Sequence, residues 1–287
     1  MDRSHLRVMT FNLLTSTKKR RTNPWRLRRR MIARIFREHR PDIVGTQEAN
    51  YQQLMELAEL LPDYEFLGEG NLGPGLAESR RSWWCAIFYR REVLQPIDSE
   101  NETFWLSPTP RVPASQFHLG TRPRLVTWNT FEHVATGRSL VFGTTHLEAA
   151  IGRHRVRSVD LLREHVDRKV DELGEDLPVF LTGDFNAVAT SPEIRAMRTA
   201  RRGQPGLRDV WEHALDVGPY AGATFRGMGL RDRIGNVLLG PRRIDYVFYR
   251  PRLQVRSVRR LGFGPLPHAA AAPSDHYPVL AEFQLSP

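Results

Sequence analysis

The order of hydrophobic and polar residues predicts strands and helices along most of the chain. Leu6–Leu13 alternates apolar and polar residues, as expected for a half-buried strand. Arg124–Glu132 and Ser139–Leu147 are longer runs separated by a turn at Gly137, which predicts a hairpin. The other predicted strands are Asp42–Thr46, Trp83–Tyr89, the apolar run that enters Leu177–Asn186, Arg243–Tyr249, Leu253–Leu261 and Val279–Phe283.

Helical spacing of apolar residues marks the first predicted helix. Apolar residues repeat at this spacing from Leu27 to Phe36. Asn23 and Pro24 before them are typical of a helix start, so we expect a helix that runs to about His39.

Three further helices are predicted along the chain. Asn50 is expected to cap a helix that carries Leu54, Leu57, Leu60 and Leu61 and is ended by Pro62. The apolar repeat from Val156 to Val170 predicts a helix of about 20 residues. Ser191, followed by proline, is expected to cap a fourth.

Loops rich in glycine, proline or alanine are expected at 68–81, 107–123 and 268–273, and loops with short strands at 201–242. Strands and helices alternate only in part, and short turns also join neighbouring strands, so the sheet must be mixed. With about ten strands, such a sheet is expected to split into two packed sheets covered by helices. We find no repeat and no clear linker, and expect one domain over 1–287.

Polar residues gather where the predicted strands end. In Leu177–Asn186 a buried strand ends in the sequence Gly-Asp-Phe-Asn, and this motif alone is more typical of an Asx-turn than of a functional site. Other predicted strand ends carry similar groups, and the oxygen ligands among all of them are Asn12, Glu48, Asp184, Asn186, Asp245 and Asp275. Oxygen ligands favour a hard ion such as Mg²⁺, or alternatively Mn²⁺.

Two histidines lie at the same kind of position. His146 ends the second strand of the predicted hairpin, and His276 directly follows Asp275. A histidine that is oriented by a carboxylate can take a proton from water near neutral pH or donate to a phosphate oxygen. Histidines in general are more often ordinary core or surface residues.

Composition narrows the class of protein and of partner. The formal net charge is +10, and arginines and lysines cluster around residues 18–21 and 26–30. Such clusters favour a polyanionic or phosphorylated partner, although solvated surface arginines would give the same pattern. The single cysteine, Cys85, excludes an internal disulfide framework and fits a reducing compartment, so we expect a cytoplasmic protein. No apolar window is long enough to span a membrane.

Eight short blocks occur in one order along the chain and together resemble the endonuclease/exonuclease/phosphatase family of metal-dependent phosphodiesterases. The blocks are TFNLL at 10–14, GTQEA at 45–49, CAIFYR at 85–90, RPRLVTW at 122–128, TTHLE at 144–148, GDFNA at 183–187, RIDYVF at 243–248 and SDHYPV at 274–279. The resemblance implies a four-layer α/β sandwich with the active site at one edge of two packed mixed sheets.

The resemblance also implies a role for each polar strand end. Glu48 resembles the principal magnesium ligand, with Asn12 and Asp275 near the same ion. Asp245 resembles the carboxylate that orients His276, the general base toward water. The other implied roles belong to Asp184 and Asn186, which position the nucleophile and the scissile phosphate, and to His146, which donates to a phosphate oxygen. Base duty could fall on either Asp184 or His276.

One block departs from the family pattern. Many relatives carry a glutamate two residues before the CAIFYR-like block, where it supports the phosphate-binding histidine, and this chain has Trp83 there. His146 therefore needs another partner, such as Glu78 or Glu148. Trp83 is either a core residue or a surface on which a base or sugar stacks. Arg124 is a candidate phosphate contact or, equally, an ordinary strand arginine.

The expected activity is Mg²⁺-dependent hydrolysis of phosphodiester bonds, with nucleic acid as the substrate, by an endo- or exonuclease. Small phosphoesters or phospholipid headgroups are the alternative substrates, and a non-catalytic polyanion-binding protein is the alternative class. A branch of the family that cleaves abasic sites would have a tyrosine where this chain has His146. No protein partner is inferred from the sequence.

Overall fold

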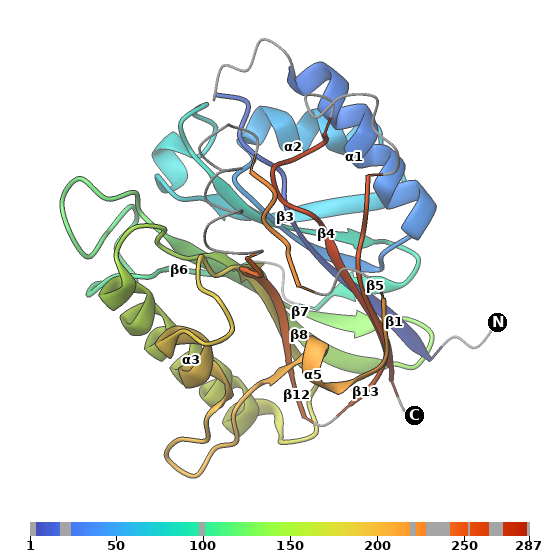
Figure 1. Cartoon of the computed structure of the whole chain (residues 1–287), viewed down its shortest axis with the longest axis vertical. Helices are drawn as coiled ribbons and strands as arrows, with labels where there is room; N and C mark the ends of the chain where they lie inside the picture. The colour runs from blue at the N-terminus through green and yellow to red at the C-terminus, as the bar shows by residue number, and fades with distance from the viewer. Residues whose placement is uncertain are drawn as a thin grey trace.

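In the computed structural model, residues 4–17, 24–97, 101–218, 222–227, 242–251, 253–263 and 272–285 are described. Two β-sheets pack face to face, and helices cover both outer faces, with α1 and α2 on one side and α3 on the other (Figure 1). This arrangement is the predicted four-layer α/β sandwich.

The first sheet joins the two ends of the described chain. In spatial order its strands are β11 (Ala214–Val217), β13 (Gln254–Arg260), β14 (Val279–Gln284), β1 (His5–Asn12), β2 (Ile43–Gln47), β4 (Trp84–Arg90) and β3 (Tyr64–Gly70). β1 pairs with β2 in parallel and with β14 antiparallel, so the sheet is mixed as predicted.

The second sheet contains the predicted hairpin. In spatial order its strands are β10 (Arg208–Asp209), β12 (Asp245–Arg250), β9 (Val179–Asp184), β8 (Arg138–His146), β7 (Leu125–His133) and β5 (Leu94–Pro96), and β6 (Glu102–Trp105) also pairs with β7. β8 and β9 are parallel and β9 and β12 antiparallel, so three polar strand ends meet at one edge. The hairpin turns at Gly137, whose φ of 66° is a conformation that glycine adopts without strain.

Helices cover each sheet with the apolar faces that their sequences predict. α1 (Trp25–His39) and α2 (Tyr51–Ala58) pack on the first sheet, and α3 (Gly152–Leu173) and α4 (Pro192–Arg198) pack on the second. Two shorter helices are η1 (Pro74–Leu76) and α5 (Val210–His213). Between the sheets, apolar side chains from both inner faces form a continuous core that includes Val8, Phe142, Phe180 and Phe283.

Several local predictions need correction. The strand β3 occupies Tyr64–Gly70, part of which was expected to be loop. β5 and β6 were not predicted, because these strands are only three and four residues long and contain no clear periodicity. Asn50 caps α2 through a capping box with Gln53, but the helix ends at Ala58, before Leu60 and Leu61.

Of the two other predicted helix caps, one occupies its position without the expected hydrogen bond and one lies outside the described residues. Ser191 makes no side-chain cap hydrogen bond to α4. Pro24 precedes α1, and Asn23 lies outside the described residues. Within the described residues, no helix is both long enough and apolar enough to cross a membrane.

Candidate active site

The polar strand ends converge where the two sheets meet. Asp184 ends β9 and lies opposite His146 of the parallel strand β8 and opposite Asp245 of the antiparallel strand β12. From the other sheet, Asn12 ends β1, and Glu48 follows the end of β2. The sheet register thus brings together residues that are more than 200 positions apart in the sequence.

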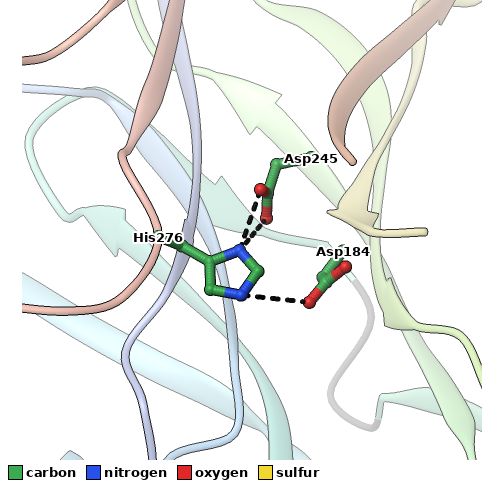
Figure 2. Close-up of side chains that lie close together, drawn as sticks. All are labelled: Asp184, Asp245 and His276. Carbon is green, nitrogen blue, oxygen red and sulfur yellow. Dashed lines mark hydrogen bonds and ion pairs between the residues drawn. The ribbon is translucent and has the colours of Figure 1, made fainter. Parts of the chain in front are cut away.

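A histidine lies between two carboxylates at this edge (Figure 2). His276 Nδ1 lies 2.9 Å and 3.1 Å from the two Asp245 carboxylate oxygens, and its Nε2 lies 3.6 Å from Asp184 Oδ2. All three side chains are buried. Because Asp245 engages Nδ1, the other ring nitrogen faces Asp184, and the ring orientation is fixed. Among the described residues, these three side chains also form a cluster whose ligand atoms lie within 4.8 Å of one another.

Burial and charge shift both partners of this contact. Burial raises the pKa of the Asp184 carboxyl to about 7, an effect that nearby His276 opposes and Asp245 reinforces. Burial would lower the pKa of His276, but the Asp245 and Asp184 carboxylates outweigh it, so that the pKa of His276 lies at about 10. Asp184 and His276 therefore titrate as a pair, because the protonation state of each side chain changes the pKa of the other.

Asn12 links the two sheets across the site. Its Nδ2 donates to Asp184 Oδ2 over 3.1 Å and to Glu48 Oε1 over 3.3 Å. Its Oδ1 accepts from the backbone N–H of Leu14. Two buried carboxylates from different sheets thus meet at one neutral amide, and such a concentration of negative charge favours a bound cation.

The segment around Asp275 is tied to the same edge. The Ser274 hydroxyl donates to the Asn12 carbonyl over 2.6 Å and accepts from the His276 backbone N–H over 3.2 Å. Arg28 of α1, itself buried, donates to the carbonyls of Leu13, Leu14 and Pro273. These contacts hold Asp275 and His276 beside the end of β1, and neither Ser274 nor Arg28 was expected from the sequence.

Backbone conformations in two of the predicted blocks are unusual. Glu48 has a φ of 66°, which is uncommon for a residue with a side chain of this size, and such strain is often found at functional sites. Asn186 has a φ of 48°, a conformation that asparagine tolerates well. Its backbone N–H donates to Asp184 Oδ1, so the Asx-turn expected as an alternative is present, and it orients Asp184 within the site.

His146 has different surroundings from His276. Its Nε2 lies 3.4 Å from Asp184 Oδ2, and its ring is nearly parallel to Trp83, with ring centroids 6.0 Å apart. The Arg122 guanidinium lies 3.9 Å from the centroid of Trp83. Trp83 is therefore neither a buried core residue nor a bare stacking surface, because it lies against His146 and Arg122.

Arg124 lies in the site rather than on the surface. Its side chain is 11% exposed, and Nε lies 3.5 Å from Glu148 Oε2. It lines one small cavity together with Glu48, Trp83 and His146. Glu148, considered as a replacement partner for His146, pairs with Arg124 instead.

One buried residue organises this part of the site and was missed at the sequence level. Asn71 accepts from the Trp83 backbone N–H over 2.9 Å and donates to the Pro123 carbonyl over 2.8 Å. It thereby ties the strand that carries Trp83 to the segment that carries Arg124. Its sequence surroundings, Gly70-Asn71-Leu72-Gly73, suggest only a turn.

Comparison with known proteins identifies the family. Residues 9–276 match the sequence profile described as the Endonuclease/Exonuclease/phosphatase family. The chain belongs to this family. Its members hydrolyse phosphoesters, so the protein is a phosphoester hydrolase.

One curated relative of this hydrolase is a considerably longer protein. Nocturnin from Drosophila melanogaster is 25% identical over 305 residues, which cover 92% of this chain and 42% of the fly protein. The chain thus spans about two fifths of the length of this curated relative.

Two solved structures from Bacteroides thetaiotaomicron are similar over nearly their whole length. One is an endonuclease/exonuclease/phosphatase family protein with 29% identity, a TM-score of 0.80 and coverage of 97% of each chain. The other is a mannosyl-6-phosphatase with 29% identity, a TM-score of 0.81 and coverage of 97% of this chain and 99% of the other.

The residues of the site fit the divalent metal on which the family generally depends. Glu48 and Asp184 offer buried carboxylate oxygens that both meet Asn12 Nδ2. Asp275 is a further buried carboxylate, next to Ser274, whose hydroxyl donates to the Asn12 carbonyl. A set of oxygen ligands suits a hard cation. The cluster of Asp184, Asp245 and His276 is less suited, because Asp245 already engages His276 Nδ1 with both of its oxygens.

Proposed function

We propose that the protein is a Mg²⁺-dependent hydrolase that cleaves phosphodiester bonds of nucleic acid by in-line attack of water. The observation that carries this proposal is the position of Asp184. It contacts Asn12, beside Glu48, on one side and His276, beside Asp245, on the other. A group that activates water would thus lie directly beside a group that can hold a cation.

Each residue has a distinct proposed role. Glu48, Asn12 and Asp275 would hold Mg²⁺, or Mn²⁺ in its place, and the ion would supply a positive charge that stabilises the charge developing on the phosphoryl oxygens. Asp245 orients His276, and the pair formed by Asp184 and His276 takes the proton from water. Asn186 holds the scissile phosphate, and His146 donates to one of its oxygens.

The charge on the opposite side of the site supports an anionic substrate. Two guanidinium groups lie near the Trp83 ring, that of Arg122 at 3.9 Å from the ring centroid and that of Arg124 at 5.9 Å. Arg124 is proposed to bind phosphate, since a guanidinium can donate two parallel hydrogen bonds to it. Trp83 and Asn186 are proposed to border the substrate. The lone cysteine supports a cytoplasmic location as part of the same proposal.

A second candidate is the hydrolysis of small phosphomonoesters. The likeness to the mannosyl-6-phosphatase favours it, because 29% identity extends over nearly the whole of both chains. The same residues would serve, since attack of water at phosphorus needs the same proton acceptor and the same charge stabilisation.

A substrate panel tests the proposal and separates the two candidates. Purified protein is assayed with Mg²⁺, with Mn²⁺ and with EDTA on single-stranded DNA, RNA, bis(p-nitrophenyl) phosphate and mannose 6-phosphate. We expect metal-dependent cleavage of the diesters, lost in Asp184→Ala and retained in Asp63→Asn, a change at an exposed carboxylate. Turnover of the monoester alone would select the second candidate. No turnover of any substrate, with Asp184→Ala indistinguishable from wild type, would reject both.

A further inference from the structure

The two long helices differ in their balance of charged residues. α1 has six arginines and one acidic residue, Glu38, whereas α3 has six basic and five acidic residues. On α3 the charges are largely neutralised by ion pairs that link it to neighbouring segments, such as Asp160 with Arg201 and Lys169 with Glu102. The excess of positive charge is therefore a property of α1 and not of helices in this protein generally.

Four of the α1 arginines form a single exposed row. They are Arg26, Arg30, Arg34 and Arg37. Their spacing of four, four and three residues keeps them within one quarter of the helix circumference, along about 16 Å of its length. Among the described residues, Arg26 and Arg30 make neither a hydrogen bond nor an ion pair, although exposed cations of this protein commonly have a carboxylate partner.

The first turn of α1, where the arginine row begins on the exposed face, is joined through its buried face to segments that flank the candidate active site. Arg28, which lies between Arg26 and Arg30 in the sequence but points inward, donates to the carbonyls of Leu13, Leu14 and Pro273. Leu13 follows Asn12, and Pro273 precedes Ser274 and Asp275. The first turn of α1 is thus fixed against the two segments that carry proposed metal ligands, and the row leads away from them.

We infer that the arginine row is a binding track for the phosphate backbone of a single-stranded nucleic acid whose scissile bond lies in the active site. The inference rests on the proposed function. Charge complementarity selects the occupant, because Arg26, Arg30 and Arg37 have no carboxylate partner among the described residues and the row carries few apolar side chains. Arg34 alone pairs with a carboxylate, that of Glu38. With one phosphate per about 3.4 Å of a stacked strand, 16 Å of helix lies along about five phosphates.

Contacts of this kind position a strand without reading its sequence. The track would therefore distinguish long polyanions from small phosphoesters, which reach only the active site. Binding should weaken with salt, because each neutralised phosphate releases counterions.

The test compares Arg26→Ala/Arg30→Ala with a control of equal charge change, Arg202→Ala/Arg259→Ala. All four side chains are exposed, and alanine is compatible with the α1 helix. One readout is kcat/KM for a 20-nucleotide single-stranded DNA and for bis(p-nitrophenyl) phosphate at several salt concentrations. The other is anisotropy of the labelled 20-mer in EDTA, which measures binding without cleavage.

In the α1 variant we expect about tenfold lower kcat/KM for the 20-mer at low salt, and unchanged turnover of the small diester. The slope of log binding constant against log salt should decrease by about 1.4, since each phosphate contact on a single strand contributes about 0.7. The control variant should show less than a twofold change.

The outcomes separate this inference from the proposed function. Binding of the 20-mer that depends on Arg26 and Arg30, without any cleavage, would support the track and reject the nuclease. Cleavage with the same salt slope in wild type and the α1 variant would reject the track. A third outcome is that the protein binds phosphatidylserine vesicles through Arg26 and Arg30 and fails to bind the 20-mer. That result would also reject the nucleic-acid track, in favour of a membrane surface.

Discussion

The two histidines of the site approach the same oxygen, Asp184 Oδ2, from different surroundings. His276 is oriented by charge, through two short contacts between Nδ1 and the Asp245 carboxylate. His146 lies against an aromatic ring, since Trp83 is parallel to it within 4°. We call the group of Asp184, Asp245 and His276 the His276 half of the site.

The His146 half consists of His146, Trp83, Arg122 and Arg124. Its side chains pack by ring and guanidinium contacts. Asn71 fixes the backbone of this half by hydrogen bonds to the Trp83 N–H and the Pro123 carbonyl. A charge-assisted hydrogen bond fixes both the orientation and the protonation of an imidazole, whereas stacking fixes only its orientation. The two halves should therefore respond differently to substitution, and four predictions examine that difference.

The largest effect is expected when the His276 half loses its orienting charge. Asp245→Asn keeps the shape of the side chain but no longer holds the His276 proton on Nδ1, so the ring loses the tautomer and orientation that present Nε2 toward Asp184. We expect kcat to fall by roughly 10³- to 10⁴-fold with little change in KM, as for loss of the orienting carboxylate in a catalytic triad. Steady-state kinetics with Mg²⁺ measures this, and a less than tenfold loss would show that Asp245 does not orient the base.

Asp184 should limit the stability of the metal-free protein. Its pKa in the folded state is about 7, above the usual value of 3.8, so its contribution to stability is fully present below about pH 4 and is lost as the pH rises through 7. Asp184→Asn should therefore raise the free energy of unfolding in EDTA by on the order of 2–4 kcal/mol at pH 8.

Urea unfolding at pH 4, 6 and 8 measures the pH dependence of this gain. The gain should grow with pH, and it should be absent in Asp63→Asn, because Asp63 is exposed. An equal gain at pH 4 and pH 8 would contradict the assignment of the pH dependence to Asp184. Asp184 would then be needed for hydrolysis without its ionised carboxylate lowering the free energy of unfolding.

The sequence predicted the His276 half more fully than the His146 half, for a physical reason. Strand periodicity and the polar residues at strand ends identify Asn12, Asp184 and Asp245. Sheet register places Asp184 opposite Asp245, and the packing of the two sheets brings Asn12 to Asp184. Where a strand ends is a local property that a single segment reveals. The likeness of the eight blocks to one family then fixes which strand ends meet.

The His146 half depends on contacts that no local pattern encodes. Asn71 stands in what resembles an ordinary glycine turn, and Arg122 lies next to proline in a segment without periodicity. Their importance comes from the pairing of Trp83, Pro123 and Asn71, which are brought together only by the folded strands β3, β4 and β7. Arg28, which is buried, was likewise counted only among the clustered cations of residues 26–30.

The next prediction examines stacking in the His146 half. Trp83→Ala removes the ring parallel to His146, and an aromatic pair is worth about 0.5–1.5 kcal/mol, so we expect kcat/KM to fall by roughly two- to twelvefold. Trp83→Phe should recover most of it, because a ring remains. If Ala and Phe variants are equally impaired, stacking is not what holds His146.

The smallest effect is expected at Arg122, the outer residue of the same group. Arg122→Ala removes a guanidinium 3.9 Å from the Trp83 ring centroid, a contact worth about 0.5–1 kcal/mol, which corresponds to about a two- to fivefold lower kcat/KM. Arg81→Ala is the matched control, since only its backbone carbonyl contacts Arg122. Because Arg122 acts on His146 only through Trp83, its removal should have no further effect in the Trp83→Ala background. Additive losses in the double variant would instead show that Arg122 contacts the substrate directly, which would make the two halves alike in using charge.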